Sequence, residues 1–96
     1  MFSDFYRKAA ELASQGTPFA IATVVRVEGS SSARRGSKAI IDPLGKLLLG
    51  WVGGGCAESA VRGEAISCIE TETPRMITVD MSDEQLGVGI DRKSVV

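Results

Sequence analysis

The stretch Gly50-Trp51-Val52-Gly53-Gly54-Gly55-Cys56-Ala57-Glu58 decides how this chain is organised. It joins an apolar, strand-like run to a run with helical periodicity through three consecutive glycines. Glycine permits positive φ and lets a ligand approach the main chain, while the first turn of a helix has unpaired N–H groups and partial positive charge. The stretch therefore predicts a strand, a turn without side chains and a helix N-terminus, which together suit phosphate or another oxyanion. We expect Gly53, Gly54 and Gly55 to bind such a ligand.

Cys56 follows the last glycine, and the pattern places it in the first turn of the helix. The partial positive charge there favours the thiolate, which is the form that binds soft metals or carries sulfur. We therefore take Cys56 as the candidate reactive residue. Two alternatives stay open: a small cysteine can simply pack in the core, and the turn can bind a dinucleotide, although its spacing departs from G-x-G-x-x-G.

Hydrophobic periodicity and turn residues predict the other elements. In chain order they are a helix over residues 3–13, a strand over 19–27, a loop over 29–36, a hairpin of strands 38–41 and 46–52, a helix over 56–70, a strand over 75–79, a turn over 87–89 and a last strand that begins at 93–96. The strand over 19–27 is apolar on both parities as far as Val25, which predicts a central strand buried on both faces. We expect Gly63, inside the second helix, to pack closely against a strand.

The 96 residues, 44% hydrophobic and 24% charged, fit one domain over residues 1–96. The order helix, strand, hairpin, helix, strand predicts an α/β domain with a mixed β-sheet and two main helices packed on it. A domain of this size buries only about two-thirds of the surface of its unfolded chain, so we expect a homo-oligomer or a larger partner.

The balance of charge excludes several classes of function. Eleven basic against twelve acidic residues leave no overall field that attracts nucleic acid or a membrane surface. No apolar run approaches the roughly 20 residues of a membrane span, and no secretory signal is visible, so we expect a cytoplasmic protein. The chain has no histidine, which removes the commonest general base and metal ligand. We predict no metal site, and we interpret Asp80, Asp83 and Glu84 as an acidic surface turn.

The loop over residues 29–36 carries the second group of candidate binding residues. Arg34 and Lys38 can close over a phosphate, with Arg35 beside them, because guanidinium and ammonium groups bind that anion well. Ser30 and Ser31 can donate hydrogen bonds to the same ligand. The alternative is a solvated basic loop whose serines bind the neighbouring main chain.

Two further residues of the second helix have opposite interpretations. Glu58 can act as an acid or a base near the thiol of Cys56, although a carboxylate in the first helical turn is favourable in any case. Cys68 lies on the apolar side of the helix and is predicted to be core. Twelve residues of helix separate the two cysteines by about 18 Å, too far for a disulfide.

Taken in order, these motifs resemble the N-terminal domain of XdhC/CoxI proteins. The matching stretches are Ala22-Thr23-Val24-Val25, Gly29-Ser30-Ser31, Arg34-x-Gly36-Ser37-Lys38, Gly53-Gly54-Gly55-Cys56-x-Glu58 and Asp83-Glu84-x-Leu86-Gly87-x-Gly89. The resemblance covers roughly residues 5–89. Ser32 stands where the family usually has proline, Trp51 where a small residue is usual, and Arg92 where many members have a second cysteine.

The resemblance implies a function that spacing alone does not prove. It implies binding of the molybdenum cofactor and help with its sulfuration or insertion into a xanthine dehydrogenase-type or CO dehydrogenase-type molybdenum hydroxylase. The implied partners are the hydroxylase apo-enzyme and a sulfur donor, and a separate Rossmann-like subunit can supply the domain that longer members carry. We expect a non-catalytic maturation chaperone, with a docking subunit that binds no cofactor and a small nucleotide-binding domain as the alternatives.

Overall fold

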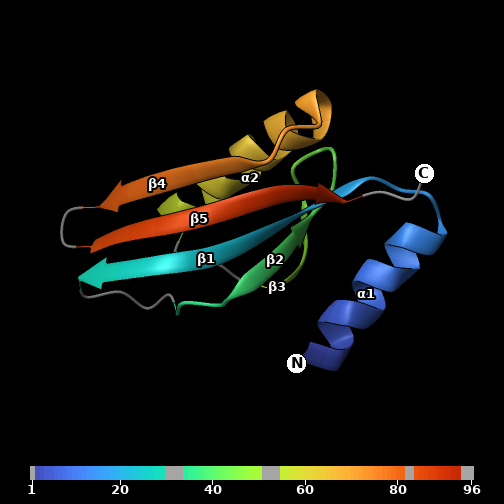
Figure 1. The fold of residues 1–96 in the computed structure, drawn as a ribbon, viewed down its shortest axis with the longest axis horizontal. Coiled ribbons are helices and arrows are strands. Elements are labelled where there is room, and N and C mark those ends of the chain that lie inside the picture. The colour runs from blue at the N-terminus through green and yellow to red at the C-terminus, as the bar shows by residue number, and fades with distance from the viewer. Residues whose placement is uncertain (1, 30–33, 51–54, 82–83, 94–96) are drawn as a thin grey trace.

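A computed structural model describes residues 2–29, 34–50, 55–81 and 84–93 of the chain. It contains two helices and five strands (Figure 1). In chain order they are α1 (Phe2–Ser14), β1 (Phe19–Gly29), β2 (Lys38–Ile41), β3 (Leu47–Gly50), α2 (Gly55–Thr71), β4 (Arg75–Met81) and β5 (Glu84–Lys93). The predicted α/β domain with two main helices is confirmed.

The strands form one sheet in the order β3-β2-β1-β5-β4, so β1 is central, as predicted. All four pairings between described strands are antiparallel, which differs from the mixed sheet that we expected. The helix α2 does connect two strands of the same direction, β3 and β4, as a crossover helix should. These two strands lie at opposite edges of the sheet, however, and β5 returns from β4 by a short connection to pair with β1. No two neighbouring strands are therefore parallel.

One face of the sheet, here called the inner face, is covered by α2. The surfaces in contact combine small side chains, which let the helix approach the strands, with larger ones such as Ile41, Leu86 and Ile90. From the strands they include Ala20, Ala22, Val24, Ala39 and Val88, and from the helix Ala57, Val61, Ala65 and Cys68. All are fully buried. Cys68 is a core residue, as predicted, and its thiol lies 3.8 Å from the carbonyl oxygen of Ile90.

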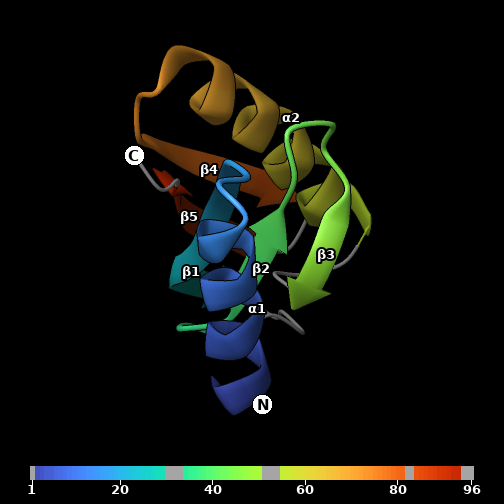
Figure 2. The same cartoon turned by 90° about the vertical axis from the view of Figure 1, so that its right-hand side faces the viewer.

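The opposite, outer face is covered only in part, by α1. Phe5 and Leu12 of this helix pack with Phe19 and Ile40 in a second, smaller core, and Figure 2 shows α1 apart from α2. Beyond this region the outer face is open, and Val25 is 43% exposed. The prediction that β1 is buried on both faces is therefore right for its first residues and wrong at Val25, because α1 covers only part of the outer face.

The hairpin of β2 and β3 forms as its turn residues predict. Asp42 holds the turn, because its carboxylate accepts hydrogen bonds from the main-chain N–H of Leu44 at 2.9 Å and of Lys46 at 2.8 Å. Gly45 has φ of +86° and donates to the carbonyl of Asp42 at 2.9 Å. The guanidinium of Arg62 in α2 donates to the carbonyl of Gly45, so the turn is fastened to the helix.

The predicted turn at Gly87 and Gly89 is wrong, because both residues lie inside β5. They face the open outer side, where β1 has a bulge that sets Val25 and Arg26 opposite Gly87. A Cβ at Gly87 would come within 3.2 Å of the Cβ of Arg26, and one at Gly89 within 3.5 Å of Met76. Crowding across the strands thus explains Gly87, whereas the 3.5 Å distance at Gly89 is an ordinary contact.

Strand β4 is longer than predicted and includes Asp80, so this part of the expected acidic surface turn is also wrong. The Asp80 carboxylate accepts a hydrogen bond from the side-chain amide of Gln85 at 2.7 Å, across the β4–β5 pair. Strand β5 ends at Lys93, and residues 94–96 of the expected last strand lie outside the described residues.

Gly63 does not pack closely against a strand, contrary to our expectation. A Cβ built on it meets no atom within 4 Å outside its own helical turn. Glycine in a helix interior costs about 1 kcal/mol relative to alanine, and nothing described around Gly63 requires its missing side chain.

We predict that Gly63→Ala raises the free energy of unfolding by about 0.5–1 kcal/mol, because the unfolded chain loses conformational freedom and the folded chain gains no clash. For a domain of this size the melting temperature should rise by about 4 °C. Thermal and urea denaturation measure both. A lower melting temperature would show that the open space is needed.

Candidate functional site

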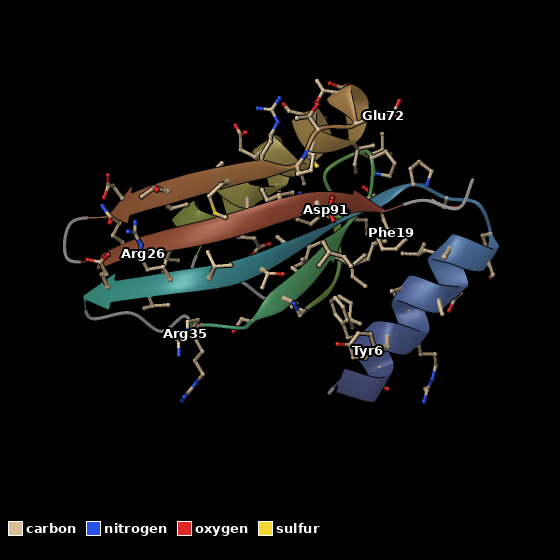
Figure 3. The ribbon with its side chains drawn as sticks, viewed as in Figure 1. Tyr6, Phe19, Arg26, Arg35, Glu72 and Asp91 are labelled. Carbon is tan, nitrogen blue, oxygen red and sulfur yellow. The ribbon has the colours of Figure 1, made fainter. Side chains whose placement is uncertain are left out.

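An open hollow of about 710 Å³ lies beside the N-terminal part of α1, between the segment that leads into β2 and the end of β3. We call it the basic hollow, because Arg34, Arg35 and Lys38 supply its charge together with the single carboxylate of Asp4. Its remaining lining residues are Phe5, Gly36, Ser37, Leu49 and Gly50. Figure 3 labels Arg35, which lies beside β2 on the segment that enters that strand.

The segment that carries the two arginines is held by main-chain hydrogen bonds to β1. The N–H of Gly36 donates to the carbonyl of Val24 at 2.7 Å, and the N–H of Val24 donates to the carbonyl of Ser37 at 2.9 Å. Gly36 has φ of +92°, a conformation that L side chains rarely adopt. These hydrogen bonds fix the main chain at Arg34 and Arg35, while the exposed side chains of both residues are free to change rotamer.

Lys38 is the first residue of β2 and the most enclosed of the three cations. Its Nζ donates a hydrogen bond to Oγ1 of Thr23 on the neighbouring strand at 3.1 Å. An ammonium has three donors, so this bond orients the group and leaves further donors for a ligand. Lys38 and Phe5 also line a second hollow of about 500 Å³ on the open outer face.

Gly50 is where the chain leaves β3 and enters the glycine turn. It has φ of +90°, and a Cβ at this position would overlap the carbonyl oxygen of Lys38. The absence of a side chain thus lets the end of β3 press against the beginning of β2. This close approach puts Gly50 beside Lys38 and in the same hollow as Arg34.

The helix α2 begins at Gly55 with Cys56 as its second residue, so the predicted helix start after the glycines is confirmed. Glu58 lies in the first turn, is half-buried, and has Oε1 3.8 Å from Nη1 of Arg62, one turn further along. This ion pair gives Glu58 a structural role that does not depend on any ligand. Because Cys68 lies on the same helix, the expected wide separation of the two cysteines also holds.

The structure brings only some of the predicted site residues together. Arg34 and Lys38 line one hollow, while Gly55, Cys56 and Glu58 lie in the first turn of α2. The remaining candidates, Ser30, Ser31, Gly53 and Gly54, lie outside the described residues, as does Trp51. The side chain of Cys56 is likewise outside the description.

Two residues of the basic hollow come from α1, a helix with no residue among the sequence candidates. Asp4 and Phe5 come from α1, far from the glycine turn along the chain, and no local motif indicates that this helix lies beside the hollow. The carboxylate of Asp4 lies 3.5 Å from the guanidinium of Arg7. Among the described residues, no three histidine, cysteine or acidic side chains form a group that could hold a metal ion. The three cations of the basic hollow favour an anion as its ligand.

A comparison with known families settles the relationship that the motifs indicate. The model of the XdhC and CoxI family matches residues 12–80, well over half of the chain. The chain belongs to the XdhC and CoxI family. Members of this family are associated with the maturation of molybdenum enzymes, which supports a role of the chain related to that process. No curated protein sequence matches it.

A solved structure supports the fold. The crystal structure described as that of a xanthine dehydrogenase from Bacillus halodurans has a TM-score of 0.76 and 23% sequence identity, and the match covers 90% of this chain. The chain spans 29% of the length of that protein. The likeness shows that the α/β arrangement of this XdhC/CoxI domain recurs inside a longer protein. No helix in the described part of the chain is long and apolar enough to span a membrane.

We predict that Gly50→Ala lowers the free energy of unfolding by more than about 2 kcal/mol, because a side chain there would meet the Lys38 carbonyl as well as adopt a strained φ. Gly36→Ala is the matched control, since φ is similar and a Cβ there meets nothing within 4 Å. It should cost only about 1 kcal/mol. Urea denaturation of both variants measures the difference, and equal losses would disprove the close approach at Gly50.

Proposed function

We propose that this chain is a maturation factor that binds the molybdenum cofactor and presents it, or sulfur for it, to a molybdenum hydroxylase. One observation carries the proposal: the basic hollow gathers Arg34, Arg35 and Lys38 around Gly50, the residue from which the chain enters the glycine turn and α2. Membership of the XdhC and CoxI family supports the connection to molybdenum enzymes.

The donors of the basic hollow fit the phosphate of such a cofactor. Two guanidinium groups offer planar pairs of N–H donors, and the ammonium of Lys38 adds a third positive charge beside them. In the proposal the N–H groups of Gly53, Gly54 and Gly55 and the hydroxyls of Ser30 and Ser31 complete the anion site. The cofactor, when bound, supplies the molybdenum centre that the hydroxylase requires.

Cys56 is the residue that we propose to act on the metal side of the ligand. As the second residue of α2 it lies in the partial positive charge of the helix N-terminus, which favours the thiolate. A thiolate is a good ligand for a soft metal and a good carrier of sulfur. Glu58 can assist by moving a proton near the thiol. We propose that the chain acts as a carrier and not as a catalyst with its own turnover.

The partners follow from this role. The proposed partners are a molybdenum hydroxylase apo-enzyme, a sulfur donor and a separate Rossmann-like subunit, and the proposed location is the cytoplasm. We also propose that the chain associates with itself.

We predict that Cys56→Ser lowers the pterin and molybdenum retained by the purified protein at least about tenfold, because the thiolate ligand is lost. Cys68→Ala is the control on the same helix, since it changes a buried thiol that faces the core. It should lower the melting temperature and keep the cofactor. Pterin fluorescence and metal analysis after purification from cells that make the cofactor measure retention.

The same experiment separates the alternatives. Retention that Cys56→Ser leaves unchanged would contradict the role of the thiol. A wild-type protein that binds the hydroxylase tightly but carries neither pterin nor metal would be a docking subunit. Stabilisation by NAD, ATP or CTP in thermal shift assays would support the nucleotide-binding alternative, since a specific ligand adds about 2.7 kcal/mol at one hundred times its dissociation constant.

We predict that the double variant Arg34→Ala and Arg35→Ala weakens cofactor binding by about tenfold or more, because charge-assisted hydrogen bonds to phosphate are lost. Lys46→Ala is the matched control: this exposed residue lies at the opposite end of the β2–β3 hairpin. Titration monitored by pterin fluorescence at low and high salt compares the variants. If the double variant and Lys46→Ala bind the cofactor with similar affinity, the basic hollow does not bind the phosphate.

A further inference from the structure

The strand β4 forms one edge of the sheet: it pairs with β5, and no described strand pairs with its other edge (Figure 1). Its seven residues pair with β5 in an unbroken register from Arg75 to Met81. The other edge strand, β3, has four residues, and its register against β2 shifts between Ile40 and Ile41. Short strands and bulges are features that protect an edge from pairing with another chain. The edge at β3 has both features, whereas β4 has neither.

The pairing of β4 with β5 determines which main-chain groups face the open edge. The N–H of Val24 in β1 donates to Ser37 and its C=O accepts from Gly36, so both groups face away from β5. Val88, the partner of Val24 on β5, therefore directs its own N–H and C=O toward Ile77 of β4. Along an antiparallel pair, hydrogen-bonded and non-hydrogen-bonded residue pairs alternate. Every second residue of β4 therefore directs its N–H and C=O away from β5. These residues are Met76, Thr78 and Asp80.

We propose that β4 pairs with β4 of a second copy of the chain, antiparallel and centred on Thr78. This register sets Thr78 opposite Thr78, Ile77 opposite Val79, and Met76 opposite Asp80. All three residues with outward main-chain groups then meet one another, and about six hydrogen bonds join the copies. A slip of one residue would pair outward with inward groups, and a slip of two would leave the outward groups of Met76 or Asp80 without a partner in β4, so the register centred on Thr78 makes the most hydrogen bonds.

The side chains of β4 suit this arrangement. Threonine opposite threonine and isoleucine opposite valine are favourable cross-strand pairs. Thr78 is exposed and Met76 is 68% exposed, so both are accessible to the second copy. The carboxylate of Asp80 is engaged by Gln85 of β5 at 2.7 Å, which directs it away from the edge. The edge therefore complements itself, which is the reason for choosing a second copy as its occupant.

The dimer would leave the candidate site of each copy open. The basic hollow is built on β2 and β3, and β3 lies at the opposite edge of the sheet from β4. The pairing gives a continuous sheet of ten strands with one hollow near each end. This inference is independent of the proposed cofactor role, because it depends only on the edge strand.

Sedimentation velocity over a range of concentrations tests the dimer. The wild-type protein should reach twice the 10.1 kDa mass of one chain. Thr78→Lys and Thr78→Glu, each alone, should shift the dimerisation midpoint to about tenfold higher concentration, because like charges then face each other across the two-fold axis. An equimolar mixture of the two should restore the dimer. Thr78→Val keeps the main-chain bonds and a β-branched side chain, so it should dimerise as the wild type does.

Three outcomes would overturn the proposal: a wild-type protein that stays monomeric at high concentration, charged variants that dimerise like the wild type, or a mixture of folded variants that does not recover the dimer. Circular dichroism checks the folding of each variant. Amide hydrogen exchange of the wild-type protein gives a test without variants. The amides of Met76, Thr78 and Asp80 should be protected at high concentration and exchange faster on dilution, and exchange that is fast at both concentrations would also contradict the pairing.

Discussion

The close packing of α2 against the inner face of the sheet is the contact on which the rest of the structure depends. Alanines from β1, β2 and α2 make up much of this contact, and small side chains on both surfaces bring helix and strands near each other. The hydrogen bond from Arg62 to Gly45 fastens the same helix to the β2–β3 turn. Helix α2 is thus held at the strands and at the hairpin, and the position of its first turn, with Cys56, follows from this packing.

The candidate site lies where several main-chain constraints meet. Gly50 allows β3 to end against the carbonyl of Lys38, and Gly36 allows the arginine segment to bind back onto β1. Both glycines have positive φ, which the neighbouring strands impose. The backbone therefore fixes the segment that carries the arginines, while their side chains supply the charge and the N–H donors of the site. In the proposed function, this arrangement binds the phosphate of the cofactor without a deep pocket.

The two faces and the two edges of the sheet differ in how completely they are covered. The inner face is closed by α2, whereas α1 covers only the part of the outer face near Phe19 and Ile40. The glycines of β5 add no side chains to the uncovered part of the outer face, and the side chains of Val25 and Met76 lie beside them. At the edges, β3 is short and β4 is long and regular. We therefore expect contacts with other molecules on the uncovered part of the outer face and along the edge strand β4.

The sequence by itself determined the features that depend on neighbouring residues. These features are the hairpin turn at Asp42 and Gly45, the helix that starts after the glycines, the core position of Cys68 and the family relationship. They could be predicted because local hydrogen bonds, backbone freedom and hydrophobic periodicity depend on residues that are close in the sequence. Only the tertiary structure decided the antiparallel order of the strands, the strand position of Gly87 and the placement of Asp4 and Phe5 beside the basic hollow. These three features depend on which distant segments pair and on which face of the sheet α1 covers. Local sequence patterns do not show contacts between residues that are far apart in the chain.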